Sequence, residues 1–339
     1  MVKRAVKRAP VKRPVKAAKG KAAPVAAGSA LVLINRGSGT VRTRGPDAIK
    51  TVVEESLARH FSPLSVRFFE GDIGAEIARA LKSRTPPAVI IAGGGDGTLA
   101  AAAQALVGSD TVMGALPLGT MNLFTRSLGF SRVLDEALAQ YGEATPDAVD
   151  VGLANGKVFL HQVSLGLQPR MARLRERMGY SSRFTKMLGA ARAFLILAAR
   201  PRMVRVRVEA DGAARKISTP MLAVTNNELG GAGDPSLPAR LDQGILAAYV
   251  LEGLSFRTLF GLARDYLFDR VKDNPAVETM TAREVILTQR PSRLLKRRRK
   301  GVLASMDGEV MVLENPIRVE IRPKALKVLR AAAARSDGM

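Results

Sequence analysis

The sequence VIIAGGGDGTLAAAAQAL at residues 89–106 combines the signals of a strand, a tight turn and a helix. The apolar run at residues 89–92 predicts a buried parallel strand, and the alanine-rich segment after Leu99 predicts a closely packed helix. The three glycines between them permit positive φ angles and expose backbone N–H groups at the helix start, where the helix dipole favours an anion. Asp96 would repel an unaccompanied phosphate. The pattern therefore predicts a nucleotide phosphate site with Mg²⁺ close by, although glycine-rich turns also arise from packing alone.

Strands and helices alternate on both sides of this unit. Strands are predicted at residues 30–35, 64–71, 88–92 and 112–119, and helices at residues 47–61, 74–84 and after Leu99, with a turn at residues 36–40. This alternation predicts an α/β domain with a doubly wound, mostly parallel sheet. Ligands of such sheets bind beyond the carboxyl ends of the strands, where both the first glycine turn and Gly119 are expected.

In the second half of the chain, the sequence pattern predicts mostly antiparallel strands. Asn155-Gly156 and Asp211-Gly212 are flanked by alternating apolar residues, which is typical of β-hairpins. Further strand candidates and two predicted helical insertions complete this half; the strands are at residues 244–253, 283–290, 302–313 and 317–323, and the insertions at 182–200 and 256–270. We therefore expect a β-rich, sandwich-like second domain.

Composition excludes several kinds of chemistry. The 339 residues contain no cysteine and two histidines, which excludes disulfides and thiolate catalysis and argues against a zinc site. No run of eighteen apolar residues could span a membrane, and no apolar core of a secretory signal is present. We therefore expect a cytoplasmic protein.

The charge of the chain is strongly positive. The net charge is +23, and residues 1–28 contain nine Lys or Arg and no acidic residue. This disordered basic tail is interpreted either as a solubilising arm or as an arm for an anionic membrane or polymer. The basic run KRRRKG at residues 296–301 is ordinarily a solvated loop, but it precedes an acidic motif and could face a lipid headgroup.

Three further motifs accompany the glycine turn: NRGSG at residues 35–39, PLGTMN at 117–122 and MDGE at 306–309. With these motifs the chain resembles the diacylglycerol kinase catalytic family, in particular the bacterial soluble lipid kinases related to sphingosine and ceramide kinases. The resemblance extends from about residue 30 to about residue 330, and includes VDVGLANGKVFLHQVSLG at residues 149–166.

The resemblance implies a two-domain, ATP-dependent lipid kinase whose active site lies in the interdomain cleft. Asp96 would hold Mg²⁺, and Glu309 would be the general base that removes the proton from the lipid hydroxyl, with Asp307 shaping the turn that presents it. The implied nucleotide-binding residues are Asn35, Ala92, Gly93, Gly94, Gly95, Asp96, Gly97, Thr98, Thr120 and Asn122. Thr120 and Asn122 could instead only cap the following helix.

The expected domain organisation follows from these motifs. It comprises a tail at residues 1–28, a nucleotide-binding domain at 29–146, a lipid-substrate domain at 147–322, and a segment at 323–339 that returns to the first domain. The expected partner is a lipid substrate, such as diacylglycerol, at an anionic membrane surface. Nucleic acid is not expected to be obligatory, a homodimer is left open, and the enzyme is expected to associate peripherally with the membrane.

The sequence departs from the family pattern at three places. Leu123 follows the Asn of the GTxN motif where an acidic residue is frequent, and Phe69 stands near the position of a nucleotide-contacting threonine. Bacterial members can hold a structural Mg²⁺ through an aspartate of the second domain. In RLDQGIL that position is Gln243, with Asp242 one residue early, so we expect this second metal site to be absent.

Two other functions compete with the lipid kinase interpretation. NAD kinases share a GGDGT turn and a β-rich second domain, and NNE at residues 226–228 superficially resembles their substrate motif. A membrane- or nucleic-acid-binding protein with a degenerate kinase fold would explain the basic charge, but the intact glycine motifs argue against lost chemistry. His60 and His161 are interpreted as structural.

Overall fold

The computed structural model describes residues 28–177, 203–231, 234–253, 274–289 and 301–332. The basic tail apart from Gly28, the helical insertions predicted at 182–200 and 256–270, and residues 296–300 lie outside the described residues. No helix in the described ranges is long and apolar enough to cross a membrane.

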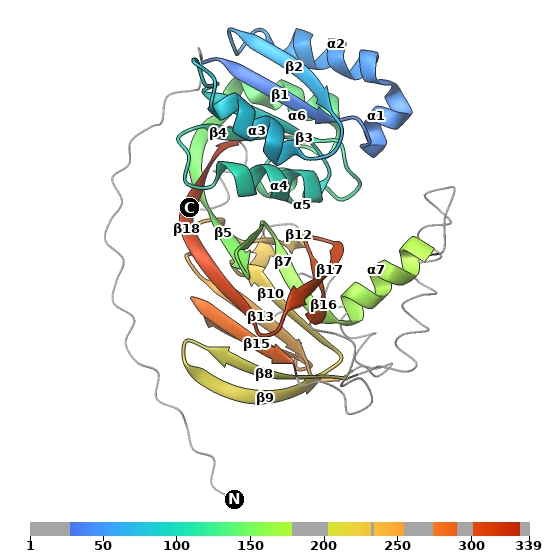
Figure 1. The fold of residues 1–339 in the computed structure, drawn as a ribbon, viewed down its shortest axis with the longest axis vertical. Coiled ribbons are helices and arrows are strands. Elements are labelled where there is room, and N and C mark those ends of the chain that lie inside the picture. The colour runs from blue at the N-terminus through green and yellow to red at the C-terminus, as the bar shows by residue number, and fades with distance from the viewer. Residues whose placement is uncertain (1–27, 178–202, 232–233, 254–273, 290–300, 333–339) are drawn as a thin grey trace, which may run out of the picture.

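The N-terminal half is an α/β domain built on parallel strands in the order β2-β1-β3-β4. Its elements are β1 (Ala30–Asn35), α1 (Gly39–Arg44), α2 (Pro46–Leu57), β2 (Leu64–Phe69), α3 (Ile73–Leu81), β3 (Val89–Gly94), α4 (Asp96–Leu106), β4 (Val112–Pro117), α5 (Leu123–Ser127), α6 (Leu134–Gln140) and the 3-10 helix η1 (Tyr141–Glu143). Helix α3 packs on α4, and α2 packs on α6, so helices cover both faces of the sheet (Figure 1). The predicted doubly wound arrangement is confirmed.

One local prediction of this domain is wrong. Residues 36–40 were expected to form a turn; residues 36–37 do, but helix α1 already begins at Gly39. The side chain of Val41 is buried in the core, and the N–H of Thr40 donates to the carbonyl of Leu118. Packing of one apolar side chain and a backbone contact from a distant loop therefore stabilise a helix too short to show a periodic pattern.

The C-terminal half is a two-layer β domain. Its elements are β5 (Thr145–Ala154), β6 (Lys157–Phe159), β7 (Gln162–Gly166), α7 (Leu167–Arg177), β8 (Val204–Ala210), β9 (Ala213–Thr219), β10 (Met221–Asn226), β11 (Leu229–Gly231), β12 (Asp234–Pro238), β13 (Leu246–Leu251), β14 (Val277–Ala282), β15 (Glu284–Gln289), β16 (Gly301–Met306), β17 (Glu309–Glu314) and β18 (Ile317–Arg330). A six-stranded sheet, β14-β13-β10-β7-β16-β17, shares a buried apolar core with β8, β15 and β18. The predicted sandwich-like domain is confirmed.

Strands β5 and β18 join the two domains. They pair antiparallel from Val319 opposite Ala154 to Arg330 opposite Thr145. The first half of β18 pairs with β15, while near its end Val328 aligns with a residue of β4 in parallel. The first sheet therefore continues into the second domain as one ten-stranded sheet, and β18 passes from the second domain into the first (Figure 1).

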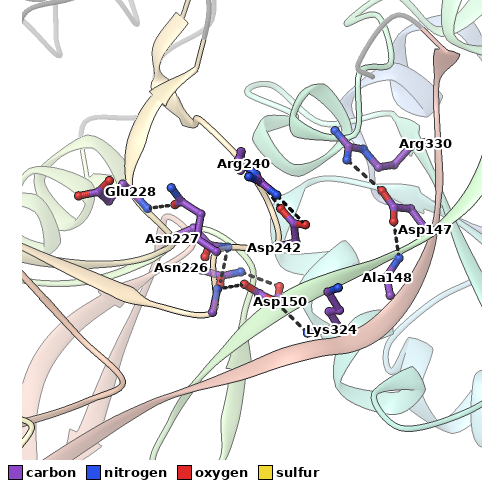
Figure 2. Close-up of polar contacts among 12 residues, drawn as sticks. Asp147, Ala148, Asp150, Asn226, Asn227, Glu228, Arg240, Asp242, Lys324 and Arg330 are labelled. Atoms are coloured by element: carbon purple, nitrogen blue, oxygen red, sulfur yellow. Dashed lines mark hydrogen bonds and ion pairs between the residues drawn. The ribbon is translucent and has the colours of Figure 1, made fainter. Parts of the chain in front are cut away.

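A buried carboxylate fixes the point where β18 changes register. Asp150 of β5 is 1% exposed, and its two oxygens accept hydrogen bonds from the N–H groups of Lys324 (2.8 Å) and Gly244 (2.6 Å) (Figure 2). Lys324 has a φ of 52° within the irregular part of β18. Charge-assisted bonds to this backbone stabilise a bulge that the strand pattern alone would not produce.

Candidate active site

Three loops meet at the carboxyl ends of β1, β3 and β4. The amide nitrogen Nδ2 of Asn35 donates to Oγ1 of Thr98 across 3.1 Å, which ties the first loop to the start of α4. A Cβ placed on Gly119 would lie 2.5 Å from the Cα of Gly95, so the two glycine turns contact each other through their backbones. A side chain at Gly119 would separate them. The structure therefore brings the predicted NRGSG, GGGDGT and PLGT motifs together.

The predicted nucleotide residues differ in accessibility. Ala92, Gly93 and Gly94 are buried within β3, whereas residues 95–98 are partly exposed at its end. Only the latter can meet a ligand without rearrangement. In the neighbouring loop, the carboxamide Oδ1 of Asn35 accepts the N–H of Gly37 at 2.8 Å.

The PLGTMN loop contains one exposed and one buried polar residue. Thr120 is exposed, which leaves its hydroxyl accessible to a ligand. Asn122 is 2% exposed; its Oδ1 accepts the N–H of Gly119 at 2.9 Å and its Nδ2 donates to the carbonyl of the same residue. Both polar groups of Asn122 therefore bond within the loop, so its side chain shapes the loop. It makes no side-chain cap on α5.

Asp96 begins helix α4 and faces the start of α5. Its Oδ1 accepts the N–H of Phe124 at 3.1 Å. Burial raises the pKa of the Asp96 carboxyl above its ordinary value, and the backbone N–H groups of residues 122–124 oppose that rise only partly. The ionised form is thus short of compensating charge, which a bound cation would supply.

Glu309 reaches the glycine turn from the second domain. It begins β17 directly after the turn Asp307-Gly308, whose φ angles of 47° and 90° are those of a tight two-residue hairpin. A Cβ placed on Gly97 would overlap the Glu309 carboxylate. The predicted base of one domain therefore lies against the predicted phosphate turn of the other, and a side chain at position 97 would displace the Glu309 carboxylate.

Asp307 holds this turn in place. Its carboxylate accepts three backbone N–H groups, those of residues 160–162, at 2.7 to 2.9 Å. Desolvation raises the pKa of Asp307 to about 6, those three bonds lower it, and the nearby charge of Asp96 raises it further. The turn that presents Glu309 is therefore bonded to the segment between β6 and β7, as the predicted shaping role of Asp307 requires.

These residues fit a magnesium ion. The described part of the chain holds no group of three or more His, Cys, Asp or Glu side chains placed to bind a metal. Mg²⁺ does not need one, because it commonly takes one or two carboxylates and completes its shell with water and substrate phosphates. Asp96, with a carboxylate destabilised by burial, is the side chain that would hold it.

Comparisons with known proteins agree with this geometry. Residues 29–154 match the diacylglycerol kinase catalytic domain family, and residues 161–330 match the YegS C-terminal NAD kinase beta sandwich-like domain. A Pseudomonas savastanoi protein described as "Probable lipid kinase YegS-like" is 31% identical over 252 residues, which cover 70% of this chain and 74% of that protein. A Pseudomonas aeruginosa protein of the same description is 30% identical, with coverage of 65% and 71%.

The chain belongs to the YegS-like lipid kinase family. It is therefore a kinase, and the resemblance deduced from the motifs is confirmed. A crystal structure of a diacylglycerol kinase from Bacillus anthracis has the same fold, with a TM-score of 0.67 at 20% identity over 90% of this chain and 98% of that one.

In the second domain, the residues at the position of the family's structural Mg²⁺ are Asp242 and Gln243, and both side chains are engaged in protein contacts. Oε1 of Gln243 accepts the N–H of Glu228 at 2.9 Å. The carboxylate of Asp242 faces Arg240, which donates to both of its oxygens at 3.0 and 3.1 Å (Figure 2). Gln243 carries no charge and the carboxylate of Asp242 is paired with Arg240, so these residues are a poor fit for the structural Mg²⁺ that the resemblance raised. Phe69, at another of the three departures from the family pattern, is a buried core residue.

EDTA is therefore expected to stop catalysis without destabilising the protein. The side-chain amide of Gln243 already bonds its loop to the backbone of Glu228, so removal of metal breaks no contact there. We expect the melting temperature of the nucleotide-free protein to change by less than about 1 °C, which corresponds to less than about 1 kcal/mol for a chain of this size. Differential scanning calorimetry with and without EDTA measures this. A large fall in melting temperature would show that a structural metal is present.

The sequence analysis missed two side chains near the site, Arg126 and Asp234, which lie close to His161. Arg126 of α5 forms an ion pair with Asp234 of β12, and the buried imidazole of His161 lies in the field of both. Burial lowers the pKa of His161 to about 4, Asp234 opposes this and Arg126 adds to it, so the ring is neutral at physiological pH. Arg126 follows the PLGTMN motif by four residues, but no local pattern connects it with a partner 108 residues away.

Proposed function

We propose that the protein transfers the γ-phosphoryl group of ATP to a hydroxyl group of a membrane lipid such as diacylglycerol. The observation that supports this proposal is the contact between the Glu309 carboxylate of the second domain and Gly97 of the first. An acceptor that enters between the domains would meet the nucleotide and the base together. Phosphoryl transfer requires little more than this positioning and charge neutralisation.

In the proposed reaction, Glu309 accepts the proton of the lipid hydroxyl as its oxygen attacks the γ-phosphorus. The bond from that phosphorus to the β–γ bridging oxygen breaks, and ADP leaves. Backbone at residues 95–97 and the Thr120 hydroxyl orient the phosphates. Mg²⁺, held by Asp96, would neutralise the phosphate charge.

Phosphorylation of a NAD-type substrate is disfavoured by the placement of the NNE segment. Asn226 is 2% exposed and Asn227 is fully buried. Nδ2 of Asn226 donates to the carbonyls of Asp150 and Leu160, so it holds the junction of β5, β7 and β10. These asparagines brace the second domain and are not available to a soluble substrate.

The proposal is tested by incubating the protein with ATP labelled on the γ-phosphate, Mg²⁺ and a total lipid extract. We expect one labelled lipid, whose identity mass spectrometry gives. NAD in place of the lipid is the comparison. Labelled NADP, or no labelled lipid from an extract that contains diacylglycerol, would contradict the proposal.

We also propose that the basic N-terminal tail holds this cytoplasmic enzyme at anionic membranes. Nine Lys or Arg in residues 1–28, without an acidic residue, support this because each basic residue near an anionic leaflet contributes about 1 kcal/mol. Deletion of residues 1–27 is expected to weaken binding to phosphatidylserine vesicles at least about tenfold and to leave turnover in detergent micelles unchanged. Vesicle co-sedimentation at matched ionic strength measures this, with neutral vesicles as the control. Equal binding by both proteins would favour a nucleic-acid-binding or solubilising tail.

A further inference from the structure

An ion pair with little solvent exposure connects the two domains beside the active site. Arg126 lies on α5 of the first domain, and Asp234 begins β12 of the second. The two side chains are only 15% and 21% exposed, so solvent screens their attraction less than that of a surface pair. Helix α5 and strand β12 face each other between the domains, on the side away from the long strand β18 (Figure 1).

Hydrogen bonds from Ser236, in the same strand, fix the orientation of the Asp234 carboxylate. Its Oδ1 accepts both the N–H (2.9 Å) and the hydroxyl (2.5 Å) of Ser236, which leaves Oδ2 to Arg126. Burial would raise the pKa of Asp234, but the bonds from Ser236 and Arg126 lower it below its ordinary value. The pair is therefore charged at neutral pH, and its geometry is fixed on the second-domain side.

Each partner is also linked to a residue of the active site. On the first-domain side, α5 carries both Arg126 and the Phe124 N–H that binds the Asp96 carboxylate. On the second-domain side, the imidazole of His161 lies near the ion pair, while its backbone N–H binds Oδ1 of Asp307 in the turn that presents Glu309. Helix α5 thus carries Arg126 and a donor to Asp96, while His161 lies near the ion pair and its backbone donates to Asp307.

We propose that Arg126 and Asp234 form an interdomain clasp that sets the position of Glu309 over the glycine turn, which makes both of them positioning residues for phosphoryl transfer. In the described part of the chain, strands β5 and β18 connect the domains on one side, so a hinge there would let the opposite side open (Figure 1). The clasp closes that side. The proposal rests on the proposed kinase reaction for its kinetic consequences but not for its structural ones.

The kinetic test compares Arg126→Gln, Asp234→Asn and the double variant. Misplacement of a reacting group by about 1 Å can cost roughly 10²-fold in rate, so we expect each single variant to lower kcat by about 10- to 100-fold. Because either change opens the same clasp, the double variant should be no slower than the slower single one. The dissociation constant for ATP, measured by direct binding, should stay within about twofold, since the nucleotide loops are not touched.

A matched control is Arg215→Gln, which removes an ion pair with Glu278 that lies within the second domain. This variant should keep its turnover. A fall in kcat for Arg126→Gln alone, with Asp234→Asn unaffected, would overturn the clasp and indicate direct contact of Arg126 with substrate. Multiplicative losses in the double variant would overturn it as well.

A structural readout separates failure of the clasp from failure of the proposed function. The chain contains no cysteine, so spin labels at Glu55→Cys and Ala214→Cys, exposed sites in different domains, report the interdomain distance without background. We expect a narrow distance distribution for the unaltered ion pair and a broader one after Asp234→Asn. An unchanged distribution would overturn the proposal, whether or not a lipid substrate has been found.

Discussion

Replacement of Glu309 by Gln is expected to lower kcat by about 10²- to 10⁴-fold, the usual contribution of a positioned general base. Glutamine has the shape of glutamate, so it can occupy the same space over Gly97, but its amide cannot accept the proton of the lipid hydroxyl. Because Glu309 is exposed, the melting temperature and the affinity for ATP should hardly change. Steady-state kinetics with the lipid, together with direct ATP binding, measure this split.

The control for this prediction is Glu314→Gln, which makes the same chemical change at the exposed far end of β17. That variant should retain its turnover. Near-normal turnover of the Glu309 variant would remove this residue from the mechanism, and the base would then have to be sought elsewhere. An equal loss in both variants would show that the strand is disturbed by any change in charge.

Replacement of Asp96 by Asn is expected to abolish Mg²⁺-dependent ATP binding. Asparagine keeps a carbonyl oxygen for the N–H of Phe124, so the start of α5 stays in place. It removes the charge that would hold the metal, and the loss of several kcal/mol of charge stabilisation corresponds to about a hundredfold or more. Isothermal titration with ATP, with and without Mg²⁺, measures the effect.

ATP binding in the absence of metal tests whether Asp96 acts through Mg²⁺. In EDTA the Asp96 variant should bind ATP at least as well as the unaltered protein, because without the metal the Asp96 carboxylate only repels the phosphates. Asp72→Asn is the matched control, because its side chain caps α3 at some distance from the site and asparagine caps helices equally well. An unchanged affinity of the Asp96 variant for ATP with Mg²⁺ would show that the metal is held by other groups.

Local patterns were sufficient to predict most of the framework. The apolar run before Gly93 forms a fully buried strand because both of its faces are covered by helices, and such runs are recognisable without knowledge of the partners. The Asp307-Gly308 turn adopts the left-handed conformations that this residue pair favours. Helix α1 was missed because its six residues are stabilised by packing and carry no helical periodicity of their own.

The motifs also indicated which residues carry the chemistry, but not how they meet. Backbone turns, strand runs and hairpins depend on side chains within a few positions of each other, so the amino-acid order determines them. The contact of Glu309 with Gly97, the pairing of Arg126 with Asp234 and the path of β18 through both domains join residues that are far apart in the chain. Such contacts leave no periodic signal, because they arise only when two independently formed cores are packed together and every buried polar group must find a partner.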